Sequence, residues 1–214
     1  PPLDTGSPNV IYLNPADQTS NLELFATLSH EGFPGHLYQT IYFLKTSPAD
    51  IRTLITSSGY VEGWATYIES YGYQYAARDL DDPAATDYTR LIALNRRINL
   101  CLYSLLDIGI HYYGWDETQA ARLLQFFGIT DAHVVSEIFQ YIVETPANYQ
   151  KYCWGCLNFL DLKKEWKDTL GDDFNLKAFH QNLLEIGPVQ FPVLQKYMNE
   201  RLQKKYKEVP VRTS

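Results

Sequence analysis

The sequence contains few of the residues that mark a disulfide-rich or a nucleic-acid-binding protein. Cysteine occurs three times in 214 residues, and an odd, sparse count does not describe a disulfide framework. Basic residues are in the minority, since 18 Lys and Arg stand against 25 Asp and Glu, which gives a formal net charge of -7. This balance argues against binding to a phosphate backbone, so we expect no nucleic acid partner. A peptide, small-molecule or metal site remains compatible with it.

Long apolar runs are also absent. A membrane helix needs roughly 18 apolar residues, and the longest candidate, residues 98–110, is interrupted by Asn99, Ser104 and Asp107. We therefore expect no membrane span. No signal peptide is visible, and the sequence begins at Pro1 without an initiator methionine. We expect a piece of a longer protein, whose N-terminal region packs on this part and could carry an export signal or a lipid anchor.

The residues that are present have the composition of an ordinary globular domain, with 45% hydrophobic and 20% charged residues. Residues 1–18 contain four prolines, and we expect an extended arm there. Residues 19–214 are expected to form one helical domain. The predicted fold class is all-α, a layered domain of about eight helices with a kinked metal-site helix. The apolar spacing predicts helices over 20–33 with a continuation to 43, 50–56, 60–78, 88–113, 115–127, 132–143, 146–170, 176–186 and 192–206.

Cys153 and Cys156 have the C-x-x-C spacing of thiol redox motifs. Such a motif normally opens a helix after a strand in a βαβ unit, and no strand is predicted before Cys153. We therefore favour two cysteines on the buried face of a helix, and thiol redox chemistry is kept as an alternative.

Two histidines lie close together, at positions 30 and 36. In the zinc protease motif H-E-x-x-H the imidazoles are four residues apart and share one helix face. Here they are six apart, and at about 100° per residue a regular helix would place His36 about 240° round from His30. Pro34 and Gly35 permit a local loop-out that returns His36 to the His30 side. The alternative is a kinked helix with two ordinary histidines.

A carboxylate on a second predicted helix could complete a metal site. Glu62 begins this helix 26 residues after His36, and a glutamate so placed supplies the third protein ligand in one class of zinc proteases. Glu69 lies two turns further along the same face, where it could orient a ligand by hydrogen bonding. The alternative is that Glu62 is a first-turn glutamate, favoured by the helix dipole.

Five blocks of the sequence together carry a resemblance to a known family. The blocks are His30-Glu31-x-x-Pro34-Gly35-His36, Glu62-Gly63-Trp64-Ala65-x-Tyr67-x-Glu69, Asp107-x-Gly109-x-His111 with Gly114-Trp115, Pro146 to Gly155 with Tyr152-x-x-Gly155, and Phe179-His180 with Leu184, Gly187 and Pro192. They resemble the bacterial family catalogued as "domain of unknown function 885", which is similar to zinc metallopeptidases of the gluzincin type. The resemblance covers nearly the whole chain, as the C-terminal part of a longer member.

The resemblance implies a role for each site residue. His30, His36 and Glu62 would hold Zn²⁺, and Glu31 would be the general base. Oxyanion stabilisation needs a donor beyond the metal, and the resemblance offers His111 and Tyr152 for this catalytic role. Asp107, four residues before His111, would orient that histidine, as Glu69 would orient a ligand. The alternatives are a packed His111 paired with Asp107 and a structural Tyr152.

The sequence therefore predicts a helical zinc-dependent peptidase that acts on peptides. The competing interpretation is a non-enzymatic helical binding module whose aromatic residues line a groove for peptide or sugar. A tight zinc ion in each chain would favour the enzyme.

Overall fold

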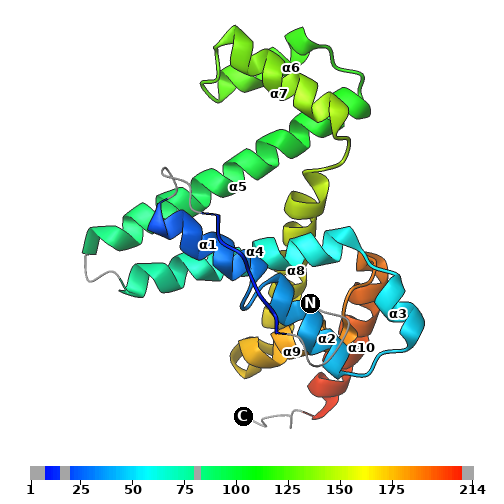
Figure 1. Ribbon diagram of the computed structural model, residues 1–214. Coiled ribbons are helices and arrows are strands. Elements are labelled where there is room, and N and C mark those ends of the chain that lie inside the picture. Colours follow the sequence, from blue (N-terminus) through cyan, green and yellow to red (C-terminus); the bar gives the residue numbers. More distant parts are fainter. Residues whose placement is uncertain (1–7, 15–19, 80–82, 209–214) are drawn as a thin grey trace.

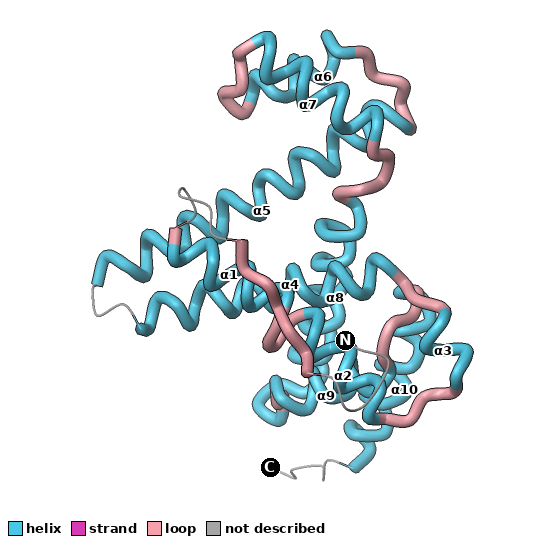
Figure 2. The backbone as a smooth tube through the Cα atoms, viewed as in Figure 1, coloured by secondary structure: helices cyan, strands magenta, loops and turns pink. Residues whose placement is uncertain are grey.

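The computed structural model describes residues 8–14, 20–79 and 83–208, and in these ranges it is helical with no strand (Figures 1 and 2). This confirms the all-α prediction. The helices are α1 (Asn21–Glu31), α2 (His36–Lys45), α3 (Asp50–Leu54), α4 (Ser58–Asp79), α5 (Pro83–His111), α6 (Glu117–Phe126), α7 (Ala132–Glu144), α8 (Gln150–Leu170), the 3-10 turn η1 (Gly171–Asp173), α9 (Leu176–Ile186) and α10 (Phe191–Glu208). Residues 8–14 of the predicted arm carry no helix or strand, and the rest of that arm lies outside the described ranges.

Side-chain caps account for where several helices begin. Ser20 and Glu23 form the capping box at the start of α1 that the sequence predicts. Asp116 caps α6 in the same way, and Asp131 accepts two backbone hydrogen bonds at the start of α7. The predicted start of α8 at Pro146 was wrong, because Ala147 has a φ of 61° and the helix begins only at Gln150.

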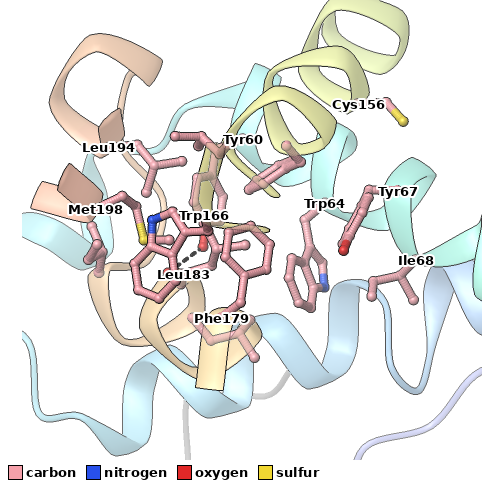
Figure 3. Close-up of a cluster of buried hydrophobic side chains, with 14 of the residues drawn as sticks. Tyr60, Trp64, Tyr67, Ile68, Cys156, Trp166, Phe179, Leu183, Leu194 and Met198 are labelled. Atoms are coloured by element: carbon pink, nitrogen blue, oxygen red, sulfur yellow. Dashed lines mark hydrogen bonds between the residues drawn. The ribbon is translucent and has the colours of Figure 1, made fainter. Parts of the chain in front are cut away.

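The larger hydrophobic core lies between α4, α8, α9 and α10 (Figure 3). It is rich in aromatic rings, and Trp64, Phe159 and Phe179 are almost fully buried in it. The hydroxyl of Tyr60 donates to the Leu183 carbonyl at 2.7 Å, so this buried polar group is satisfied. Full burial of each large apolar side chain contributes about 1.5–3 kcal/mol.

Two glycines allow α4 and α8 to pack backbone against backbone. A Cβ built on Gly63 would lie 2.5 Å from the carbonyl carbon of Gly155. A Cβ built on Gly155 would lie 2.7 Å from the Gly63 Cα and closer still to the Gly59 carbonyl oxygen. No side chain fits between the helices at this point, and both glycines belong to the sequence blocks named above.

A smaller core joins α6 and α7 to one end of α5. In Figure 1 this is the end of α5 that lies farther from α1. Leu106, Leu124 and Ile142 are buried there. Gly109 leaves room for the indole of Trp115, since a Cβ on Gly109 would overlap that ring. Residues 98–110 lie within α5, and no helix of the described ranges is long and apolar enough to cross a membrane.

The cysteines of the C-x-x-C sequence lie inside α8, not at the start of a helix. Cys153 and Cys156 are both buried, and this burial raises the pKa of each thiol to about 11. A thiol with such a pKa is protonated at neutral pH and is a poor nucleophile. The structure therefore favours packing over thiol redox chemistry at these positions.

Replacing Gly155 with alanine tests the backbone contact between α4 and α8. We expect Gly155→Ala to lower the free energy of unfolding by about 1–3 kcal/mol or more, because the neighbours are backbone atoms that cannot rotate away. Denaturant unfolding measures this change. Gly59→Ala is the control, since its Cβ would meet only the Phe191 ring, at 3.3 Å. Equal effects of the two substitutions would contradict the packing argument.

Candidate metal centre

A bend between α1 and α2 brings the two histidines together. Helix α1 ends at Glu31 and α2 begins at His36, so the intervening residues 32–35 leave the helical path. Gly35 packs so closely on the His30 carbonyl that a Cβ there would overlap it. The indole Nε1 of Trp64 donates to the Pro34 carbonyl at 3.1 Å and ties the bend to α4. The predicted kink of the metal-site helix is confirmed.

Three side chains of metal-ligating type meet beside this bend. His36 Nε2 lies 3.2 Å from Glu62 Oε2, and His30 Nε2 lies 3.7 Å from the same oxygen. The two imidazole rings have centroids 4.8 Å apart and are nearly perpendicular. One ligand atom from each residue lies within 4.8 Å of the others. The structure thus brings together the three residues that the sequence predicts as ligands.

Glu69 fixes the orientation of His30. Its Oε2 lies 3.2 Å from His30 Nδ1, and because a carboxylate only accepts, Nδ1 is the donor. This hydrogen bond orients the ring so that His30 Nε2 faces Glu62, and in the neutral imidazole it leaves Nε2 as the nitrogen with a free lone pair. The other oxygen of Glu69 accepts from Arg96 Nε at 3.3 Å. A carboxylate on the far nitrogen of a histidine is the usual support for a metal-ligating imidazole.

The acidic surroundings determine the pKa values within the cluster. Burial alone would lower the pKa of His30, but its contacts with the carboxylates of Glu62 and Glu69 outweigh burial and raise that pKa to about 9. Burial alone would raise the pKa of Glu62, but its contacts with His30, His36 and Lys151 hold it well below its ordinary value. A group of side chains that attracts a proton this strongly also attracts a cation.

Helix α8 contributes two further polar side chains. Lys151 Nζ lies 3.7 Å from Glu62 Oε1 and 5.0 Å from the centre of the Tyr152 ring. The Tyr152 ring lies 6.4 Å from that of His30. Burial, and then the negative charge of Glu62, raise the pKa of Tyr152, so its hydroxyl remains protonated at neutral pH.

A cleft of about 630 Å³ opens beside the cluster, between α1, α4, α5 and α8. His30, Glu31 and Tyr152 line it, together with polar residues of α5. Glu31 is exposed at the last position of α1, next to His30. The cleft therefore presents a carboxylate, an imidazole and a phenol to the same space. We name it the metal cleft.

The structure does not bring His111 or Asp107 to this cluster. His111 ends α5, where its Nε2 donates to the Ile142 carbonyl at 2.9 Å and lies 3.6 Å from Asp107. Asp107 accepts from the Ala147 backbone at 3.1 Å. His111 lies 15 residues beyond Arg96 on one helix, about 22 Å along its axis. These two side chains instead join α5 to the segment between α7 and α8.

The geometry of the cluster suits a tetrahedral divalent ion such as zinc. Zn–N and Zn–O bonds of about 2.0–2.1 Å at a tetrahedral angle require ligand atoms about 3.4 Å apart. Glu62 Oε2 lies 3.2 Å from His36 Nε2 and 3.7 Å from His30 Nε2, and these two separations bracket this value. Three protein ligands also leave a fourth position for water or substrate, as in catalytic zinc sites.

Two residues of the site, Arg96 and Lys151, were not predicted from the sequence. Arg96 follows Glu69 by 27 positions, on another helix, and no periodicity connects them. Lys151 directly precedes Tyr152, so the block around Tyr152 was the available signal for it.

The fold and the cluster define an all-helical protein with two histidines and a glutamate gathered at a bent helix pair. The chain belongs to the family described as "Bacterial protein of unknown function (DUF885)", whose model matches residues 1–198. This confirms the family expected from the sequence blocks. The comparison with curated proteins finds no match.

The chain is similar to several solved structures, including two described as putative lipoproteins. A "putative lipoprotein" from Colwellia psychrerythraea is 28% identical, with a TM-score of 0.67 over 84% of this chain. A "putative lipoprotein of unknown function" from Shewanella oneidensis is 24% identical, with a TM-score of 0.72 over 92% of this chain, and shows the shared fold. The matches span only 30% and 37% of those two longer chains.

Metal binding is testable without any assay of activity. We expect metal-stripped protein to take up one zinc ion per chain, and His36→Ala and Glu62→Ala to abolish tight binding because each removes a ligand. Glu69→Gln should weaken binding by about 10–100-fold, since it only orients His30. Calorimetric titration measures these affinities. His133→Ala, at a histidine with an 83% exposed side chain, is the control and should bind zinc normally.

Proposed function

We propose that this protein is a zinc-dependent peptidase, similar in its site to gluzincins. The observation that carries the proposal is the convergence of His30, His36 and Glu62 with the exposed carboxylate of Glu31 beside them. When bound, zinc would polarise the scissile carbonyl and lower the pKa of water to about 7. His30 and His36 would hold it through Nε2, and Glu62 through a carboxylate oxygen.

Glu31 is the proposed general base. It directly follows the proposed ligand His30 in the sequence, is exposed, and lines the metal cleft. Its carboxylate accepts the proton of the attacking water and then delivers it to the leaving amine. The exposure of Glu31 suits this work, because the carboxylate must reach first the water and then the amine nitrogen.

Tyr152 is the proposed donor to the oxygen that gains negative charge. Its hydroxyl must be protonated to donate, and burial together with the Glu62 charge raises its pKa. Lys151 lies next to it and adds positive charge on the same side of the cluster. His111 lies too far along α5 to share this role in the present arrangement, and we assign it the positioning of the segment between α7 and α8.

The competing function is a binding module with an aromatic groove. Trp64 and Trp166 give it little support, because both are almost fully buried in the core. Peptide is the proposed substrate because a glutamate base beside a two-histidine, one-glutamate site is the arrangement of zinc peptidases. We also propose an exported or lipid-anchored protein, since the similar structures from Colwellia psychrerythraea and Shewanella oneidensis are each described as a "putative lipoprotein".

Glu31→Gln tests the catalytic proposal. The amide keeps the shape of the side chain and cannot accept the proton, so hydrolysis of a peptide library by the zinc-loaded protein should fall by at least about 10²-fold. Zinc content should remain at one ion per chain. Glu165→Gln, a substitution on α8 away from the cleft, should change neither quantity. Cleavage by Glu31→Gln at the original rate would rule out Glu31 as the base.

Tyr152→Phe tests the oxyanion donor. Loss of one such donor typically lowers kcat by about 10²–10³, so we expect that reduction with zinc affinity retained. Tyr149→Phe is the matched control, because Tyr149 packs on Tyr103 and Tyr141 instead of His30. If zinc affinity fell along with kcat, Tyr152 would be a support of the metal ligands.

A further inference from the structure

A second hollow, of about 780 Å³, lies between α4, α5 and α8. This volume is within the range of small-ligand sites. Its described lining residues include one carboxylate, Glu69, and five cationic side chains, which are Arg78, Arg90, Arg96, Arg97 and Lys163. The chain as a whole has a net charge of -7, so this region has a charge opposite to that of the protein. We name it the basic hollow.

The cationic charge of the basic hollow is largely unneutralised by the described residues. The single carboxylate, that of Glu69, is already occupied by His30 and by Arg96 Nε. Arg96 has five N–H donors and uses one of them there. Within the described ranges, no ion pair includes Arg97 or Lys163.

Neutral groups hold the ammonium of Lys163 in place. It donates to the Tyr71 hydroxyl at 2.7 Å and lies over the rings of Tyr71 and Tyr67. The Tyr67 hydroxyl is 2.8 Å from His180 Nε2, and burial, together with the Lys163 charge, lowers the pKa of His180 to about 4. His180 is therefore uncharged at neutral pH. This network orients a cation without neutralising it, and two N–H donors of Lys163 remain.

A buried hydroxyl in the same wall also lacks a partner. Thr66 Oγ1 is inaccessible to solvent and makes no hydrogen bond with described residues, although Thr66 lines the basic hollow. Thr66 is more than nine-tenths buried. A ligand in the basic hollow cannot reach an oxygen that is closed to solvent, so the cationic side chains, and not Thr66, are the groups that indicate a ligand.

We propose that the basic hollow binds a carboxylate of the peptide substrate, which makes acidic peptides the preferred substrates. This inference rests on the proposed peptidase function. Arg96, Glu69 and Tyr73 line both the basic hollow and the metal cleft, so the two spaces adjoin at these three side chains. The guanidinium fork of arginine matches the two oxygens of a carboxylate, and peptides carry carboxylates on side chains and at the C-terminus.

The test measures peptide binding by calorimetry with the whole zinc-loaded protein carrying Glu31→Gln, so that the peptides stay intact. The first set of peptides consists of alanine-based hexapeptides with a single glutamate, which occupies a different position in each peptide. The second set has glutamine at the same positions. A further pair differs only in a free or amidated C-terminus, which separates the two sources of carboxylate. Arg97→Gln and Lys163→Gln are each introduced separately into the Glu31→Gln protein. Lys164→Gln is the control, because Lys164 is exposed and pairs with Asp168.

We expect at least one acidic peptide to bind about tenfold or more tightly than its neutral match, as charged hydrogen bonds permit. Arg97→Gln and Lys163→Gln should each remove most of this preference, and Lys164→Gln should preserve it. Equal affinities for acidic and neutral peptides, an unchanged preference in both variants, or no binding of either peptide would overturn the inference. A charge preference in a protein that takes up no zinc, or whose form with Glu31 intact hydrolyses no peptide, would support carboxylate binding in the basic hollow and overturn the proposed function.

Discussion

Helices α4 and α8 cross with their backbones in contact at Gly63 and Gly155, and the two sides of the candidate site depend on this crossing. Glu62 directly precedes Gly63, and Tyr152 lies three residues before Gly155, less than one helical turn away. A larger side chain at either glycine would separate the helices and move the glutamate away from the lysine and tyrosine of α8. The glycines therefore explain why the sequence blocks around Glu62 and Tyr152 each contain one.

The bend at residues 32–35 positions His30 and His36, as the α4–α8 crossing positions Glu62 and Tyr152. Its contact with Trp64 connects it to α4, so the bend and Glu62 are held by the same helix. The half-buried carboxylate of Glu62 and the buried carboxylate of Glu69 each have a cationic neighbour, Lys151 for Glu62 and Arg96 for Glu69. Because unpaired buried charges are costly, these two neighbours allow the carboxylates to stay ionised close to the histidines.

The sequence predicted those features that local rules control. Helix periodicity and the Ser20 capping box predicted the all-α fold, and the chemistry of Pro34 and Gly35 predicted the kink. It could not predict Arg96 beside Glu69 or the basic hollow, because these depend on the angle between α4 and α5. His111 was expected to face the metal cleft with Tyr152. It is the last residue of the 29-residue helix α5, and a sequence motif does not show how far the end of a helix lies from a site beside its middle.

Arg96 belongs to two environments, since its Nε hydrogen bonds to Glu69 on the metal side and its side chain also lines the basic hollow. Any ligand that shifts this guanidinium also changes the hydrogen bond that Glu69 makes with His30. Two binding equilibria that share a side chain in this way are thermodynamically linked. Linkage is reciprocal, so an anion that strengthens metal binding by some factor must itself be bound more tightly by the same factor when the metal is present.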